Sequence, residues 1–296
     1  MSSLAVISVR DLTKVYGKSR GIDKVNLEVN EGEIYGFIGP NGAGKSTTIK
    51  LLLNLIYPTD GSASVFGLDI VKDSKKIKTR TGYVPSDVRY YSNMTALELL
   101  KATLAFHNKS NTAGIDELCE TFEIEKNKKF SNLSQGNKKK VAIGVALVNE
   151  PELIILDEPT NGLDPLMQNR LFETLKERNK KGTTIFVSSH NLNEVQEHCT
   201  KAAFIKDGKI IEIEELTKAF KHSKFVTLSA DEIPIAIFQK IGEKIIRNEN
   251  DTISFSYSGD LNELIKIIYN LKIKELTIEN TSLESKFLSY YDGGEK

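Results

Sequence analysis

Short apolar runs alternate with segments of helical periodicity up to about residue 215. Three runs are almost continuously apolar, at residues 34–38, 153–156 and 184–187, which is typical of strands buried on both faces of a parallel sheet. Further strands are predicted over residues 4–9 and 25–29, the second with clear alternation. The predicted helices cover residues 44–55, 95–107, 114–123, 134–149 and 165–180. Strands that alternate with helices indicate an α/β fold with a mostly parallel sheet.

Polar sequences directly follow the three continuously apolar runs. The run at 34–38 leads into a glycine-rich loop, and the other two lead into Asp157-Glu158 and into a Ser-Ser-His sequence that ends at His190. In an open α/β sheet, ligands bind at the carboxyl ends of the strands. We therefore expect these groups to lie together along one edge of the sheet.

The glycine-rich loop reads G-P-N-G-A-G-K-S over residues 39–46, which matches the phosphate-binding P-loop pattern G-x-x-x-x-G-K-[ST]. Its glycines allow backbone N–H groups to surround phosphate oxygens, and the following helix adds the positive end of its dipole. Lys45 is expected to reach the β- and γ-phosphates, and the Ser46 hydroxyl to hold Mg²⁺. The residues predicted to bind ATP here are Gly39, Pro40, Asn41, Gly42, Ala43, Gly44, Lys45, Ser46 and Thr47.

Asp157 and Glu158 follow a strand that is predicted to be buried. An unpaired buried carboxylate is costly, so each of the two is expected to face a charge or water. Asp157 can serve the Mg²⁺ shell, directly or through water. Glu158 can accept a proton from the attacking water or orient it. Together with the P-loop, the pair predicts ATP hydrolysis.

The pattern changes after about residue 215. Strands are predicted at 225–229, 244–248, 252–257 and 274–278, and helices at 233–241, at 260–270 and from 282 onwards. Thr281 and Glu284 fit a capping box at the start of the last helix. The order βαββαβ is typical of a small α+β domain of the ferredoxin-like type. We therefore predict a C-terminal accessory domain over residues 216–296, with a dimerisation or stability role and a regulatory role both open.

The charges balance, with 40 Lys plus Arg against 40 Asp plus Glu, so no nucleic-acid partner is expected. The basic runs at 72–80 and 138–140 are interpreted as solvated faces. Cys119 and Cys199 are the two cysteines of the chain, which suits a reducing cytoplasm. No apolar run approaches the roughly 20 residues that a membrane-spanning helix needs, so we expect any membrane role to depend on a partner.

The motifs in this order resemble those of ABC-type ATPases, the nucleotide-binding subunits of ABC transporters. Residues 133–137 read L-S-Q-G-N, similar to the family signature L-S-G-G-Q, and residues 157–164 read D-E-P-T-N-G-L-D, like Walker B running into the D-loop. His190 stands at the switch position, and Tyr16 where the family places an adenine-stacking aromatic. The resemblance implies an ATP-binding cassette over residues 1–215, with a helical subdomain at about 86–150.

The resemblance also implies how such cassettes work. Two of them meet head to tail, here expected as a homodimer, and the signature of one closes on the ATP bound by the other. Ser134 and Gly136 would contact that ATP from a helix N-terminus, a natural anion site. Glu158, His190 and Lys45 are the expected catalytic residues.

Three residues depart from the family pattern. The signature has Gln135 in place of a glycine and Asn137 in place of a glutamine, and Ser86 follows G-Y-V-P where the family commonly has a glutamine. Serine is short, which puts direct metal contact in doubt, although a bridging water can substitute. We hypothesise that Ser86 lowers turnover or shifts coupling without abolishing hydrolysis.

The sequence N-T-S-L-E-S-K-F-L at 280–288 is similar to the ending of many bacterial drug- and antibiotic-exporting ABC ATPases. The leading hypothesis is therefore the motor of an exporter, located in the cytoplasm on the inner face of the membrane. It would dock on a separate permease through the region near 86–107. Two alternatives stay open: a soluble ABC ATPase outside transport, and an ATP-sensing regulatory module with weak hydrolysis.

Overall fold

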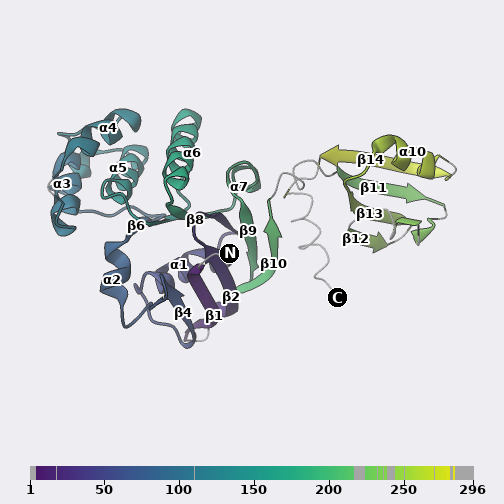
Figure 1. The fold of residues 1–296 in the computed structure, drawn as a ribbon, viewed down its shortest axis with the longest axis horizontal. Coiled ribbons are helices and arrows are strands. Elements are labelled where there is room, and N and C mark those ends of the chain that lie inside the picture. The colour runs from purple at the N-terminus through teal and green to yellow at the C-terminus, as the bar shows by residue number, and fades with distance from the viewer. Residues whose placement is uncertain are drawn as a thin grey trace. The chain divides into compact units, whose positions relative to one another are not determined.

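The computed structural model describes residues 5–17, 19–109, 111–216, 224–231, 233–235, 237–238, 244–249, 251–269, 271–280 and 283. The chain forms two compact units (Figure 1). The first holds residues 1–191 and 198–213, and the second holds residues 192–197 and 214–296. The change between Ile213 and Glu214 lies beside the predicted boundary at residue 215. The assignment of two domains stays a prediction.

A mostly parallel sheet runs through the first unit, in the order β10-β9-β3-β8-β7-β6. The pairs β6–β7, β7–β8, β3–β8 and β3–β9 are parallel. Every residue of β3, β7 and β8 is buried, which explains their unbroken apolar runs. The strands are β3 (Ile34–Ile38), β6 (Thr81–Val84), β7 (Leu153–Asp157), β8 (Thr184–Ser189), β9 (Lys201–Lys206) and β10 (Lys209–Glu215).

An antiparallel sheet of order β2-β1-β4-β5 forms another layer of this unit. Its strands are β1 (Ala5–Tyr16), β2 (Ser19–Asn30), β4 (Asp60–Val65) and β5 (Leu68–Asp69). The prediction stopped the first strand at residue 9 and missed β4 and β5. The early end of the first strand has a physical reason, a shift of register between Val9 and Leu12, where Asp11 has a left-handed φ of 48° and the alternation breaks.

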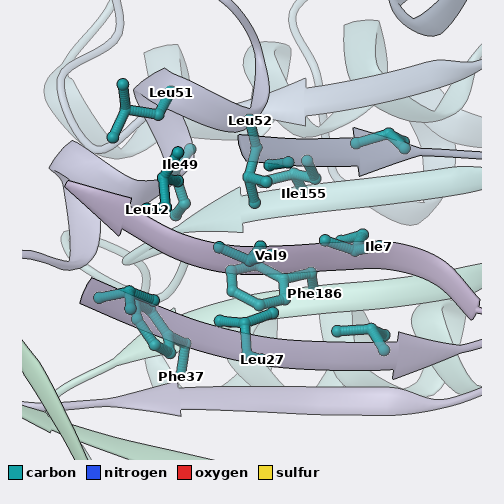
Figure 2. Packing of buried hydrophobic residues seen from close by; sticks show 14 of the residues in the cluster. Ile7, Val9, Leu12, Leu27, Phe37, Ile49, Leu51, Leu52, Ile155 and Phe186 are labelled. Carbon is teal, nitrogen blue, oxygen red and sulfur yellow. The ribbon is translucent and has the colours of Figure 1, made fainter. Parts of the chain in front are cut away.

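The two sheets share one apolar core with helix α1 (Lys45–Leu52), as Figure 2 shows. Val9 and Leu27 come from the antiparallel sheet, and Phe37 and Phe186 come from the parallel one. The Tyr35 and Phe186 rings stack with centroids 5.8 Å apart. Because α1 contributes buried side chains to this cluster, the loop between β3 and α1 is anchored at both of its ends.

The helices of the first unit have identifiable start signals. Thr95 forms a capping box with Glu98, and the Asp164 and Ser134 side chains accept backbone N–H groups of Met167 and Asn137. The Ser134 cap confirms the predicted start of α5. The helices are α2 (Ser74–Thr79), α3 (Ala96–Phe106), α4 (Ala113–Thr121), the 3₁₀ turn η1 (Phe130–Asn132), α5 (Gln135–Leu147) and α6 (Pro165–Lys180). Of these, α3, α4 and α5 fall within the range 86–150 of the predicted helical subdomain.

The second unit contains an antiparallel sheet of order β12-β13-β11-β14. This is the strand order of a ferredoxin-like βαββαβ domain, with a buried core that includes Phe238 and Phe255. Of the predicted helix at 233–241, residues 235, 237 and 238 are helical and residues 236 and 239–241 lie outside the described residues. The last helix with its Thr281–Glu284 box also lies outside them, apart from the buried Leu283. The elements are α7 (Leu192–His198), β11 (Lys224–Ala230), β12 (Lys244–Glu249), β13 (Thr252–Tyr257), α10 (Leu261–Ile268) and β14 (Ile273–Asn280).

Within the described residues, no helix is both long enough and apolar enough to span a membrane.

Candidate functional site

The loop between β3 and α1 needs glycine at several positions. Gly42 and Gly44 have φ values of 82° and 114°, in a region that side chains rarely adopt. A Cβ on Gly39 would lie 2.4 Å from the Ile205 carbonyl oxygen, and one on Gly44 would lie 2.7 Å from Ile22. The loop is therefore packed closely against β9 and β2, with its conformation fixed by its neighbours.

Lys45, the first residue of α1, turns its side chain back toward this loop. Its Nζ donates to the carbonyl oxygens of Gly39, at 2.5 Å, and Pro40, at 3.1 Å. It also lies 3.1 Å from Glu158 Oε1, in an ion pair whose side chains are 6% and 9% exposed. That carboxylate oxygen has no partner with hydrogen-bond geometry. A buried charge needs a partner of opposite sign, and here the two charges provide it for each other.

Glu158 follows β7 in a left-handed conformation with a φ of 49°. Its backbone N–H is held by the carbonyl and the hydroxyl oxygens of Ser188, both at 3.2 Å. Its Oε2 lies 2.7 Å from Nδ1 of His190. Left-handed glutamate costs on the order of 1 kcal/mol or more and persists only where surrounding contacts hold it, as they commonly do at functional sites. The carboxylate thus stands between a lysine and a histidine.

Asp157, the last residue of β7, is fully buried. Its Oδ1 accepts a 2.7 Å hydrogen bond from the Ser188 hydroxyl, whereas its Oδ2 has no hydrogen-bond partner. A buried carboxylate oxygen without a partner is costly, and Mg²⁺ is a partner that it suits. Burial first, and then the nearby Asp157 charge, raise the pKa of Tyr83, so its phenol stays neutral.

An open cavity of about 400 Å³ brings most of the predicted nucleotide residues together. Gly39 and Ala43, which belong to the loop, do not line the cavity and are buried. Gly21 and Asn161 line the cavity but were not predicted to do so. Asn161 could have been predicted from the sequence, because it lies within the D-loop motif at residues 157–164. The lining residues are Tyr16, Gly21, Pro40, Asn41, Gly42, Gly44, Lys45, Ser46, Thr47, Ser86, Glu158 and Asn161.

Tyr16 lies at the end of β1, with 44% of its surface exposed. The Lys14 ammonium lies 5.4 Å from the centre of its ring. Behind the ring, a Cβ on Gly21 would come within 2.8 Å of Tyr16, so this glycine leaves space for the ring. An aromatic face at the rim of a phosphate-binding cavity can stack on a nucleobase.

The donor set fits Mg²⁺. Ser46, which carries a hydroxyl, lines the cavity, and Asp157 has a buried oxygen without a partner. Among the described residues no three His, Cys, Asp or Glu side chains form a metal cage. That is the usual situation for Mg²⁺ bound with a nucleotide, because phosphate oxygens and water complete its shell.

Ser134 and Gly136 do not line this cavity. Ser134 is exposed at the start of α5, and Gly136 packs so closely on the D-loop that a Cβ there would lie 2.6 Å from the Gly162 carbonyl oxygen. The structure thus joins the P-loop, Tyr16, Ser86, Glu158 and, through Glu158, His190, and it leaves the signature segment outside that group.

A family model described as ABC transporter matches residues 22–161. The chain is 35% identical to the bacitracin transport ATP-binding protein BcrA of Bacillus licheniformis over 98% of both chains. It is 34% identical to the linearmycin resistance ATP-binding protein LnrL of Bacillus subtilis, over 70% of this chain and 68% of that one. A dimeric bacterial ABC transporter cassette superposes with a TM-score of 0.66 and 29% identity, over 71% of this chain and 99% of that one. The chain therefore belongs to the ABC transporter family, as one of its ATP-hydrolysing ATP-binding subunits.

Proposed function

We propose that this chain is the motor subunit of an exporter, in which ATP hydrolysis powers a separate membrane permease. The observation that carries the proposal is the Glu158 carboxylate, which contacts His190 at 2.7 Å and Lys45 at 3.1 Å beside the phosphate-binding loop. A carboxylate oriented by a histidine, on a residue that lines the same cavity as a phosphate-binding lysine, is suited to activating water against a phosphoryl group.

The roles of the side chains follow from their chemistry. Lys45 binds the β- and γ-phosphates, and in doing so it exchanges its contact with Glu158 for a contact with phosphate. Glu158 Oε1 is then available to accept the proton of the attacking water, while His190 holds Oε2. Tyr16 stacks on the adenine. Ser46 and Asp157 hold Mg²⁺, Asp157 directly or through water, and the bound ion supplies charge neutralisation on the phosphate oxygens.

The active form is proposed to be a homodimer. Ser134 is exposed at a helix N-terminus, where backbone N–H groups can bind phosphate oxygens, yet it lies outside the cavity of its own chain. A second copy would bring its own Ser134 and Gly136 to this cavity. The dimeric cassette that superposes on this chain supports this assembly.

Relatives named for bacitracin and linearmycin support export of an antibiotic, a drug or a similar compound. We further propose that the chain works in the cytoplasm, on the inner face of the membrane, where its permease holds it. The region near residues 86–107 would provide the docking surface. It includes Tyr91, an aromatic side chain that is 78% exposed.

Phosphate release from ATP, measured with the wild type and with Glu158→Gln, tests the proposal. The variant should lose phosphate release by about 10²-fold or more, because an amide cannot act as a base. It should also accumulate as an ATP-dependent dimer in light scattering, since ATP is bound but not hydrolysed. Glu117→Gln, an exposed change on α4, is the matched control and should behave as the wild type.

Two outcomes would contradict the proposal. If the wild type binds ATP but releases no phosphate in the presence of its permease, the proposed motor function is wrong and the alternative of an ATP-sensing module is favoured. If Glu158→Gln stays monomeric with saturating ATP, the proposed closure of two copies around ATP is wrong.

A further inference from the structure

Lys139 lies on α5, five residues after Ser134, and its side chain is buried. Its Nζ donates to three backbone carbonyl oxygens, those of Pro85 at 2.9 Å, Ser86 at 3.0 Å and Glu158 at 3.3 Å. An ammonium group has three N–H donors and no acceptor. Every donor of Lys139 is therefore used on a backbone that surrounds the ATP cavity.

The neighbouring lysines have other environments, and the interpretation of residues 138–140 as a solvated face was wrong for Lys139 and Lys140, which are both buried. Lys138 Nζ lies 5.5 Å from the centre of the Phe130 ring, and Lys140 pairs with Glu123 at 3.4 Å. Burial lowers the pKa of Lys139, while the charges of Asp157, Glu158 and Asp87 oppose that effect. An ammonium is costly to bury, and three carbonyl oxygens offset that cost here.

The acceptors of Lys139 belong to two different segments. Pro85 and Ser86 follow β6, and Glu158 follows β7, two strands that pair in parallel. Ser86 and Glu158 both line the ATP cavity. Lys139 thus bridges the backbones of two residues that line the same cavity.

The hydrogen bond from Lys139 to the Glu158 carbonyl oxygen also helps to fix the strained backbone of Glu158. Glu158 has a left-handed φ, and Ser188 binds its N–H from one side. Lys139 binds its carbonyl oxygen from the other. With both sides of this residue fixed, the carboxylate is presented at one place relative to Lys45 and His190.

We propose that Lys139 is a positioning residue for ATP hydrolysis. Its ammonium sets the spacing between the backbones at Ser86 and Glu158, and it ties both to α5, the helix that Ser134 caps. A movement of α5 is thereby transmitted to the backbone of the proposed base.

The test replaces Lys139 by Met, which keeps an unbranched apolar stem of similar bulk and removes the three donors. Steady-state phosphate release should show kcat lowered about tenfold or more, the scale of one lost charge-assisted hydrogen bond. The Kd for ATP, measured by equilibrium dialysis, should stay within about twofold, because Lys139 lies outside the cavity lining. Lys139→Arg, which keeps charge and donors, should restore part of kcat. Lys138→Met is the matched control and should leave both values unchanged.

The bridge to the second segment is tested by combining Lys139→Met with Ser86→Gln. If Lys139 acts through the backbone at residue 86, the two changes in kcat should be non-additive. The proposal is overturned if Lys139→Met keeps the wild-type kcat, or if kcat and ATP affinity fall together and Lys139→Arg rescues neither. If Lys139→Met does not fold, judged by circular dichroism, Lys139→Gln decides, and wild-type turnover in that variant overturns the proposal.

Discussion

His190 Nδ1 lies 2.7 Å from Glu158 Oε2, and this contact joins the segments that follow two neighbouring strands, β8 and β7. The other oxygen of the carboxylate lies 3.1 Å from Lys45 Nζ. The histidine therefore contacts one carboxylate oxygen of Glu158, and the other oxygen faces Lys45 beside the phosphate-binding loop. This is the arrangement of a base that is held in place by a third group.

Replacing His190 by Ala is expected to lower kcat for ATP hydrolysis by roughly 10²-fold, because Glu158 loses the group that orients it. The KM for ATP should change little, since the imidazole does not line the cavity. Phosphate release over a range of ATP concentrations separates the two parameters. His107→Ala, outside the cavity, is the control, and a His190→Ala variant with wild-type kcat would refute the role.

Ser86 lines the cavity, and serine is shorter than the glutamine that the family commonly has at this position. Ser86→Gln is expected to raise turnover about fivefold, which corresponds to ~1 kcal/mol of barrier, and to lower the Mg²⁺ concentration needed for half-maximal rate. The physical reason is that the longer amide can reach the metal and the attacking water. A magnesium titration of the ATPase rate measures this, with the exposed Ser92→Gln as control. An unchanged rate and an unchanged metal dependence would end the hypothesis about Ser86.

Gly136→Ala would place a Cβ 2.6 Å from the Gly162 carbonyl oxygen, so the start of α5 or the D-loop must shift. We expect weaker ATP-dependent dimerisation of a Glu158→Gln background in light scattering, while ATP binding to the monomer persists. Gly114→Ala is the matched control, because it lies in helix α4 with nothing within 4 Å of the added carbon. That change should stabilise the fold by roughly 0.5–1 kcal/mol. Equal dimerisation of both variants would contradict the role of the signature segment.

Arg80 makes two hydrogen bonds to Glu152, at 2.7 and 2.6 Å, and lies 3.8 Å from the centre of the Phe66 ring. The hydrogen bond from Arg80 lowers the pKa of Glu152. A carboxyl group whose folded-state pKa is lowered stabilises the fold above its unfolded pKa and loses that contribution as the pH falls through the folded value.

Urea denaturation should therefore show Glu152→Gln less stable than the wild type at pH 7. We expect a loss of up to ~1 kcal/mol, because the Arg80 and Glu152 side chains are 38% and 59% exposed and water screens the pair. The difference should shrink as the pH falls below the ordinary glutamate pKa of about 4.3. A difference that stays constant with pH would mean that the charge of Glu152 does not stabilise the fold.

Phe255 is fully buried in the core of the second unit, with its ring centre 5.2 Å from that of Phe238. Phe255→Ala should destabilise that core by roughly 3–5 kcal/mol. If residues 216–296 form a domain of their own, thermal unfolding of the variant should show two transitions. The first, from this domain, should occur at a lower temperature than in the wild type. The second, from the ATP-binding unit and recognised because added ATP raises its temperature, should have the same midpoint as in the wild type. A single transition that moves as a whole would contradict the proposed division into two domains.

The sequence by itself determined the chemistry of the site. The P-loop, the Asp157-Glu158 pair and the Ser134 cap are local patterns, and their backbone requirements are met within a few residues. Strands buried on both faces leave a continuous apolar run, so the parallel sheet and the common edge at its carboxyl ends could be predicted as well. The antiparallel sheet could be predicted only in part: strands were expected at 4–9 and 25–29, but the first was cut short because register shifts in β1 interrupt the alternation that marks a strand.

Only the tertiary structure decided which side chains contact which distant residues. Lys138, Lys139 and Lys140 are chemically the same in the sequence, yet Lys139 alone reaches the Ser86 and Glu158 backbones. Its acceptors lie 53 and 19 positions away along the chain. Burial of a charge is favourable only where such remote groups converge on it. That convergence is a property of the packed chain, and no local pattern of residues records it.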